Sequence, residues 1–222
     1  MNNQPIQYQR GWVEFYKLRF KVTPDVLIPR PETELLVDAV LASLRGDLSM
    51  KKFPVVLDLG TGAGVIAISV AVNNPDCKIV ATDVSDKALK VAEENAKLHN
   101  VDDRIEFVTS DLLVDVTPQG CDILVTNLPY IPTARIPYLD SSVKDYEPHV
   151  SLDGGEDGFE LYRQLFQQIN DLNWKPKLII GEIDYTHGEL ALSQAQKYFP
   201  EANCEVKLDL HHKQRILKID RN

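Results

Sequence analysis

The feature that most constrains the fold is a buried apolar run that passes directly into alternating glycines. Residues 54–59 read PVVLDL, Gly60 to Gly64 read GTGAG, and the apolar stretch 65–71 follows. Such glycines let the backbone turn tightly and let a ligand approach the main chain without a Cβ in the way. The spacing is G-x-G-x-G rather than the dinucleotide pattern G-x-G-x-x-G, because Val65 takes the place of the last glycine. The pattern predicts a strand, a ligand-binding or structural turn, and a helix.

Acidic residues end the next two predicted strands. Asp83 follows the strand 78–82, about 20 residues past the glycines, where a carboxylate can bind both hydroxyls of a ribose. Ser85 can cap the helix predicted for 87–99. Asp111 follows the strand 104–108 and can accept from an adenine amino group, although a simple turn aspartate explains it equally well. Together the glycines and Asp83 predict a nucleoside site.

The predicted fourth strand, 121–125, opens into Thr126 to Pro132, a loop with two prolines. A planar NH2 group, in an amide or an adenine, is a poor nucleophile because its lone pair is delocalised. The Asn127 side-chain oxygen and the Leu128 carbonyl can accept its two N–H groups, with Pro129 keeping Leu128 extended. Tyr130 can stack on the planar group. Asn127, Pro129 and Tyr130 are therefore the candidate catalytic residues, Asn127 to Tyr130 the candidate substrate site, and no general base is required.

The order of the predicted elements indicates one α/β architecture. Residues 12–22 alternate as a β-hairpin, strands and helices then alternate, and strands at 204–210 and 215–219 close the chain. We expect a doubly wound, mostly parallel seven-stranded sheet with an antiparallel last strand, preceded by a short β-hairpin. The predicted division is an N-terminal extension with the hairpin at 1–25 and a main domain at 26–222. Residues 132–150 and the glycine-rich turn 151–158 form a candidate lid or substrate-facing loop.

Charge and composition weigh against several classes of partner. The net charge of the 222 residues is −9, and no dense run of lysine and arginine occurs, so nucleic acid is an unlikely partner. No apolar run approaches the ~20 residues of a membrane span, and residues 1–10 lack a signal-peptide core. The three cysteines lack metal-ligand spacing, and His211 and His212 read as turn residues, so we expect no metal. The expected location is the cytoplasm.

The string IPRPETE at 28–34 carries a more specific resemblance. With the glycine turn, Asp83, Asp111, Glu147-Pro148 and the DGGEDG string at 153–158, the chain resembles class I S-adenosylmethionine-dependent methyltransferases. In particular, it resembles the protein-(glutamine-N5) methyltransferases that modify peptide chain release factors. The resemblance implies S-adenosylmethionine as cofactor and a release factor as protein substrate. The site residues that it implies are Asp58, Gly60, Thr61, Gly62 and Gly64 around the methionine moiety, Asp83 on the ribose, Asp111 and Leu112 beside the adenine, and Asn127 next to both cofactor and substrate amide.

Three positions depart from that family's pattern. Leu128 replaces the first proline of Asn-Pro-Pro-Tyr, a form also similar to ribosomal RNA adenine dimethylases, and Asp184 and His187 replace a glycine and a glutamine. Only about 25 residues precede the IPRPETE string, so the family's N-terminal helical domain is expected to be missing. N6-adenine methylation of RNA or DNA is therefore the alternative enzymatic interpretation. A non-catalytic nucleoside-binding domain is the third.

Overall fold

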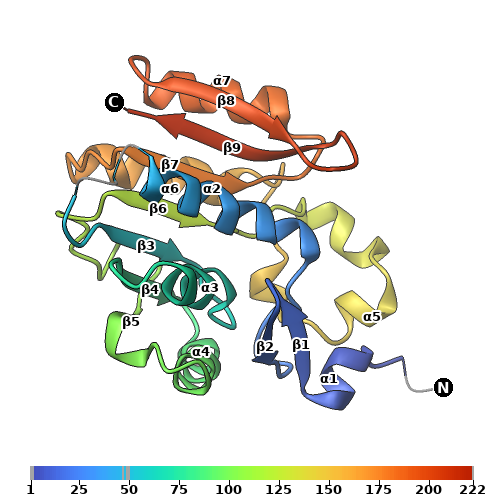
Figure 1. Ribbon diagram of the computed structural model, residues 1–222. Helices are drawn as coiled ribbons and strands as arrows, with labels where there is room; N and C mark the ends of the chain where they lie inside the picture. The colour runs from blue at the N-terminus through green and yellow to red at the C-terminus, as the bar shows by residue number, and fades with distance from the viewer. Residues whose placement is uncertain (1–2, 47, 49–50, 222) are drawn as a thin grey trace.

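A seven-stranded sheet is the frame of the protein, and the computed structural model describes residues 3–46, 48 and 51–221. The strands lie in the order β5-β4-β3-β6-β7-β9-β8 (Figure 1). Their bounds are β3 Val55–Leu59, β4 Lys78–Asp83, β5 Ile105–Thr109, β6 Ile123–Thr126, β7 Leu178–Glu182, β8 Asn203–Leu208 and β9 Gln214–Asp220. The predicted doubly wound α/β sheet is confirmed, because β3 to β7 pair in parallel and β9 pairs antiparallel with β7 and β8.

The chain reverses its direction of winding at β3. Strands β4 and β5 extend from one side of β3, whereas β6 pairs with its other side. In open α/β sheets, ligands bind at the carboxyl ends of the strands where the order reverses. The site is therefore expected at the tips of β3 and β6, which end at Leu59 and Thr126.

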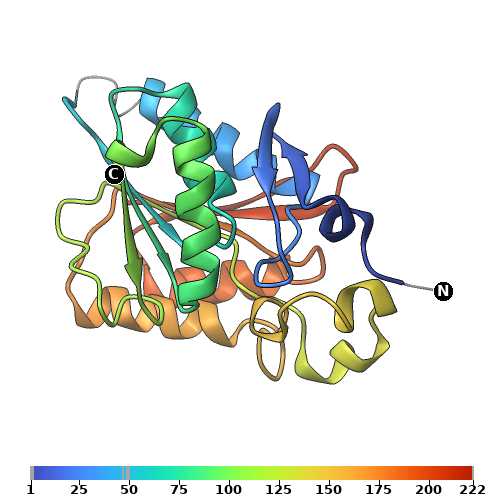
Figure 2. The same cartoon turned by 90° about the horizontal axis from the view of Figure 1, so that it is seen from below.

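Helices cover both faces of the sheet, as Figure 2 shows. One face carries α2 (Glu34–Arg45), α3 (Val65–Asn73) and α4 (Asp86–Leu98), and the other carries α6 (Glu160–Asp171) and α7 (Gly188–Tyr198). Successive residues of a strand belong to different cores: Val56 packs with the first set of helices and Leu57 with the second. Because both faces are buried, the central strands read as continuous apolar runs rather than alternating ones.

The N-terminal segment packs on the first of these faces. The predicted hairpin is present as β1 (Trp12–Phe15) and β2 (Leu18–Lys21), preceded by a short helix, α1 (Ile6–Arg10), which we did not predict. Phe15 and Phe20 are buried in the same core as α4. Asn95 of α4 holds the main chain of Lys21, accepting from its N–H at 2.7 Å and donating to its carbonyl at 3.0 Å. The division of the chain at residue 25 stays a prediction.

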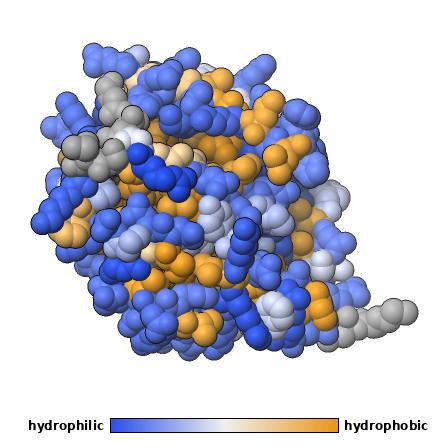
Figure 3. Space-filling view, viewed as in Figure 1, coloured by the Kyte–Doolittle hydropathy of each residue, from blue (hydrophilic) through white to orange (hydrophobic). Residues whose placement is uncertain are grey.

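The segment after β6 contains short helices instead of the irregular loop that we expected. They are η3 (Thr133–Tyr138), α5 (Ser141–Lys144) and η4 (His149–Ser151). Figure 1 shows this segment and the hairpin on the side of the sheet to which the β3 and β6 arrows point. On the face shown in Figure 3, hydrophobic areas are separated by hydrophilic ones. Among the described residues, no helix is long and apolar enough to cross a membrane.

Candidate active site

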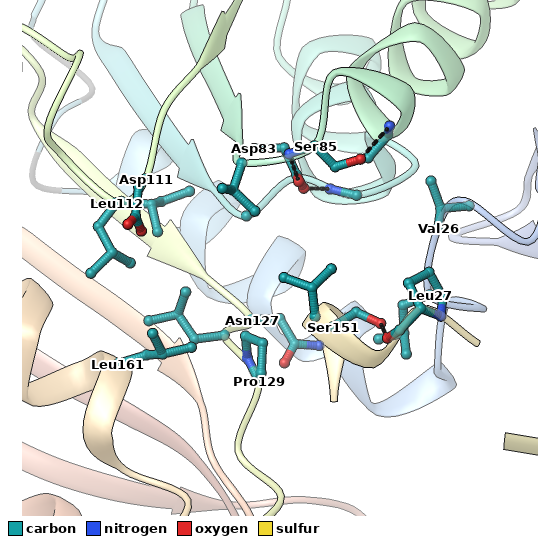
Figure 4. Close-up of a pocket in the computed structure, with 18 of the residues that line it drawn as sticks. Val26, Leu27, Asp83, Ser85, Asp111, Leu112, Asn127, Pro129, Ser151 and Leu161 are labelled. Atoms are coloured by element: carbon teal, nitrogen blue, oxygen red, sulfur yellow. Dashed lines mark hydrogen bonds between the residues drawn. The ribbon is translucent and has the colours of Figure 1, made fainter. Parts of the chain in front are cut away.

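A cavity of about 300 Å³ lies at the carboxyl ends of the central strands (Figure 4). The predicted site residues that line it are Gly60, Gly62, Asp83, Asp111, Leu112, Asn127, Leu128 and Pro129. In Figure 4, Asp83 and Asn127 lie on opposite sides of the cavity, and Asp111 and Leu112 lie together to one side. Two segments distant in sequence, 25–27 and 148–151, complete the wall. The remaining predicted residues, Asp58, Thr61, Gly64 and Tyr130, are not part of the cavity lining.

The glycine turn has the backbone geometry that its sequence predicts. Gly60, Gly62 and Gly64 have φ of 73°, 55° and 81°, values that side chains with a Cβ rarely adopt. Gly64 also packs closely, because a Cβ there would lie 2.8 Å from Ile68 Cδ1 and 3.3 Å from Ala92 Cα. The turn can therefore present bare backbone to the cavity while α3 and α4 stay packed beneath it.

Asp58 lies under this turn and is fully buried. Its Oδ2 accepts from the Thr61 hydroxyl at 2.7 Å and from the Ala67 N–H at 3.0 Å, which ties the turn to the first turn of α3. Its Oδ1 has no hydrogen-bond partner within the part of the chain that the structure describes. Burial raises the pKa of Asp58 to about 6, and the two hydrogen bonds act in the opposite direction. Asp58 and Thr61 thus stabilise the conformation of the glycine turn from its buried side.

The raised pKa of Asp58 predicts a pH dependence of stability. The folded protein holds this proton more tightly than the unfolded chain, whose carboxyl titrates near 3.8. The contribution is therefore fully present below pH 4 and is lost as the pH rises to about 6. Relative to Asp58→Asn, the wild-type free energy of unfolding should fall by about 3 kcal/mol across this window. Urea denaturation of both proteins from pH 4 to 7 measures the difference, and parallel curves would contradict it.

Asp83 is held by backbone donors from two elements. Its Oδ2 accepts from the Gly62 N–H and its Oδ1 from the Ser85 N–H, both at 2.9 Å. Burial raises its pKa, and these backbone hydrogen bonds act against that rise. The Ser85 hydroxyl in turn accepts from the Ala88 N–H at 3.2 Å, so the predicted cap of α4 is confirmed. The Asp83 carboxylate is thereby fixed at the tip of β4, on the cavity wall.

The loop after β6 is anchored from both sides. The buried Thr126 donates its hydroxyl hydrogen to the Leu59 carbonyl at 2.7 Å, which joins the ends of β6 and β3. Asn127 Nδ2 donates to Thr33 Oγ1 at 3.2 Å. The Leu128 side chain is buried, and its Cδ2 lies 3.7 Å from where a Cβ on Gly60 would be. Leucine at this position therefore fills the core beneath the glycine turn.

Tyr130, which follows the lining residue Pro129, is not itself part of the cavity lining. Its hydroxyl donates to Glu182 Oε1 at 3.1 Å, and burial, followed by the charge of Glu182, raises its pKa well above the usual range. We did not single out Glu182 from the sequence. The signal in the sequence was an acidic residue that directly ends the apolar run of β7 (Leu178–Glu182). In the structure, 1% of the Glu182 surface is exposed.

The DGGEDG turn packs directly on this loop through Gly154. The Gly154 N–H donates to the Ile131 carbonyl at 2.9 Å, and the Ile131 N–H donates to the Leu152 carbonyl at 3.1 Å. A Cβ on Gly154 would lie 2.7 Å from the Pro129 carbonyl oxygen and 2.8 Å from Tyr130 Cα. Only glycine fits here without displacing the loop that carries Asn127.

Gly154→Ala is therefore expected to lower the free energy of unfolding by about 2 kcal/mol, since backbone atoms must move to admit the methyl group. Urea denaturation measures the loss. Gly120→Ala separates the two causes, because among the described residues a Cβ there meets nothing within 4 Å, and its loss comes only from the positive φ of 101°. A loss below about 0.5 kcal/mol in Gly154→Ala, the range of an ordinary surface substitution, would contradict the packing argument.

The IPRPETE string joins two segments of the cavity wall and also contacts the hairpin outside the cavity. Arg30 Nη2 lies 2.5 Å from Oε1 of Glu147, whose side chain is 1% exposed, and Glu147 Oε2 accepts from the Ile28 N–H at 3.1 Å. These bonds join the two cavity-wall segments. At the other end, Glu34 Oε1 accepts from the Tyr16 N–H of the hairpin at 2.7 Å.

The two departures after β7 lie outside the cavity lining. Asp184 Oδ1 accepts from the Thr186 N–H at 2.9 Å, and the buried His187 ring stands edge-on to Phe159 with centroids 6.2 Å apart. His211 and His212 are exposed on the turn between β8 and β9, as predicted. These four residues are therefore separate from the candidate active site.

The cavity fits an adenosine-bearing methyl donor. The glycine turn leaves open space at Gly62, where a Cβ would meet none of the described residues within 4 Å. Asp83 offers carboxylate oxygens for ribose hydroxyls, and Leu112 offers an apolar surface for a base beside Asp111. These three features occur in one cavity, as the nucleoside prediction requires.

Comparison with known proteins gives a family model and several curated relatives that share a name. Residues 33–136 match the family model "Methyltransferase small domain". Release factor glutamine methyltransferase of Bacillus cereus is 37% identical over 215 residues, covering 96% of this chain and 75% of that protein. The protein of the same name from Lactococcus lactis is 38% identical over 218 residues, covering 98% and 77%. That from Moorella thermoacetica is 40% identical over 205 residues, covering 92% and 71%.

Solved structures share the fold at low sequence identity. The catalytic domain of human Mettl16, in complex with a MAT2A 3′UTR hairpin, has a TM-score of 0.72 at 16% identity, covering 92% of this chain and 76% of that one. A ribosomal protein L11 methylase from Lactobacillus delbrueckii has a TM-score of 0.61 at 22% identity, covering 90% and 84%. At these identities the likeness concerns the fold alone.

Proposed function

The chain belongs to the release factor glutamine methyltransferase family, and we propose that it methylates a glutamine side-chain amide of a peptide chain release factor. It is an S-adenosylmethionine-dependent N-methyltransferase. The observation that carries the choice of residues is the position of Asn127, at the end of β6, on the wall of the cavity that also holds Asp83 and the glycine turn.

S-adenosylmethionine supplies an electrophilic methyl group, and the protein must bind it and orient the acceptor nitrogen. Gly60, Gly62, Asp83, Asp111 and Leu112 are the proposed cofactor contacts, because they line the cavity. Asp83 would accept from the ribose hydroxyls with the lone pairs that Gly62 and Ser85 leave free. Asp58, Thr61 and Gly64 would serve by holding the turn in shape.

The glutamine amide is activated by orientation. Asn127 Oδ1 and the Leu128 carbonyl would accept its two N–H groups, which directs the nitrogen lone pair at the methyl group. Pro129 limits Leu128 to extended conformations and so restrains its carbonyl. Tyr130 would position the loop through its bond to Glu182, in addition to the predicted stacking on the substrate. The nitrogen loses its proton to water after transfer, when it is cationic, so no protein base is required.

A labelling experiment tests the proposal. The protein is incubated with methyl-labelled S-adenosylmethionine and, separately, with unmethylated release factor, ribosomal RNA and DNA. Label on a release-factor glutamine, located by mass spectrometry, is the expected result. Label in nucleic acid alone would overturn the proposal in favour of N6-adenine methylation. Cofactor binding with no transfer to any substrate would favour a non-catalytic nucleoside-binding domain.

We further propose that the protein acts in the cytoplasm, where translation terminates.

A further inference from the structure

The buried carboxylate of Glu182 joins the IPRPETE string to the loop after β6. Thr33 Oγ1 donates to Glu182 Oε2 at 2.7 Å across a separation of 149 residues, and both residues are almost fully buried. Tyr130 donates to the other oxygen, Oε1, at 3.1 Å. The backbone carbonyl of Glu182 accepts from the Tyr162 hydroxyl at 2.6 Å, which holds the end of β7 in place. Thr33 is thereby held at a defined position beside Asn127.

The Thr33 hydroxyl has one hydrogen, and Glu182 receives it. An ionised carboxylate has no hydrogen to offer, so Thr33 Oγ1 must donate to it and can only accept on its other side. Asn127 fills that position with Nδ2, at 3.2 Å. An asparagine amide has two orientations that exchange its NH2 and its oxygen. Because Thr33 Oγ1 can only accept here, its contact with Asn127 favours the amide orientation in which the NH2 points toward Thr33. That orientation leaves Oδ1 available to the substrate.

We propose that Thr33 and Glu182 are positioning residues that fix the Asn127 amide with its oxygen available to accept from the substrate NH2. The inference rests on the proposed function, because the substrate that Asn127 would orient is the glutamine amide. It also assigns a role to the threonine of the IPRPETE string. Burial raises the pKa of Glu182, and the hydrogen bond from Thr33, the charge of Arg215 and the hydrogen bond from Tyr130 act against that rise.

Thr33→Val tests the inference, because valine keeps the shape of the side chain and removes the hydroxyl. We expect kcat to fall about tenfold, the effect of losing one orienting hydrogen bond, while the KM for S-adenosylmethionine stays unchanged. Thr33→Ser, which retains the hydroxyl, should restore kcat. Glu182→Leu, which removes the acceptor of the Thr33 hydroxyl, should lower kcat in the same way, and the double variant should lose little more, because both residues act through Asn127. Wild-type kcat in folded Thr33→Val would overturn the inference.

A matched control comes from the same string. Glu34→Ala removes the bond to the Tyr16 N–H and leaves the Thr33 contacts in place. It should lower thermal stability without lowering kcat. An equal fall of kcat in Glu34→Ala and Thr33→Val would show that Thr33 acts through general stability, and would overturn the positioning role.

A second readout does not depend on the proposed function. The side-chain NH2 signals of Asn127, assigned in a ¹⁵N-labelled protein by their loss in Asn127→Ala, should shift in Thr33→Val and stay in place in Glu34→Ala. Unchanged Asn127 signals in Thr33→Val would overturn the contact itself. If the wild-type protein transferred no methyl group to any release factor, the proposed function would fail while the NMR result still decided the inference.

Discussion

Asn127→Ala is expected to lower kcat by about 10²- to 10³-fold and to change the dissociation constant for the cofactor by no more than about threefold. The large factor follows because a preorganised hydrogen-bonding partner at a reacting group typically contributes this much to the rate. The change in the dissociation constant is expected to be small because Asn127 is one of many residues that line the cavity, and the glycine turn and Asp83 remain intact in the variant. Steady-state kinetics with release factor and calorimetric binding of S-adenosylhomocysteine measure the two quantities.

The chain offers a matched control for this variant. Asn73, at the end of α3, donates its Nδ2 hydrogen to the Ser69 carbonyl at 2.8 Å and is not part of the cavity lining. Asn73→Ala removes the same chemical group and should leave kcat unchanged. Undiminished turnover in Asn127→Ala would rule out its side chain as an acceptor for the substrate. A loss of cofactor binding equal to the loss of rate would assign Asn127 to the cofactor alone.

Asp83→Ala is expected to weaken cofactor binding by about 10²- to 10⁴-fold. Hydrogen bonds to a charged group contribute about 1.5–3 kcal/mol each, and a carboxylate that holds two ribose hydroxyls loses both in this variant. Calorimetric titration with S-adenosylhomocysteine measures the change. Asp111→Ala is the comparison, because a single bond to an adenine amino group predicts a smaller loss, of about 10- to 100-fold.

A modified ligand separates the ribose contact from the support that Asp83 gives to Gly62 and Ser85. A 2′,3′-dideoxy analogue of S-adenosylhomocysteine lacks the hydroxyls that Asp83 would bind. The wild-type protein should bind this analogue far more weakly than the parent compound, whereas Asp83→Ala should bind the two about equally. If the ratio of the two dissociation constants, for the parent compound and for the analogue, were the same in both proteins, Asp83 would act only on the backbone of Gly62 and Ser85.

Local patterns predicted the strands, the long helices and the positions of the main polar groups. The run before Gly60 became β3, the acid after the next strand became the tip of β4, and the proline-containing loop became the exit from β6. These predictions succeed because hydrophobic runs, glycine turns and helix caps act over a few residues. The carboxyl ends of parallel strands meet at one edge, so residues that follow such strands can be grouped without a structure.

The packing of segments that are distant in the sequence was harder to predict. The two closing strands, β8 and β9, were predicted, but not that β9 lies between β7 and β8. The short helices between residues 133 and 151 were also missed, because each has six residues or fewer and gives little periodicity. Their position depends on bonds such as that between Arg30 and Glu147, 117 residues apart.

The sequence by itself determined the α/β sheet, the glycine turn and the Asn-Leu-Pro-Tyr loop at a strand end, because each is a property of a short stretch of chain. Only the tertiary structure decided what stands beside Asn127. Its amide contacts Thr33, which lies 94 residues earlier in the sequence, and Thr33 contacts Glu182, which lies 149 residues after Thr33. The hydrogen-bonding partners of a buried polar group are set by which elements pack together, and no local pattern specifies them.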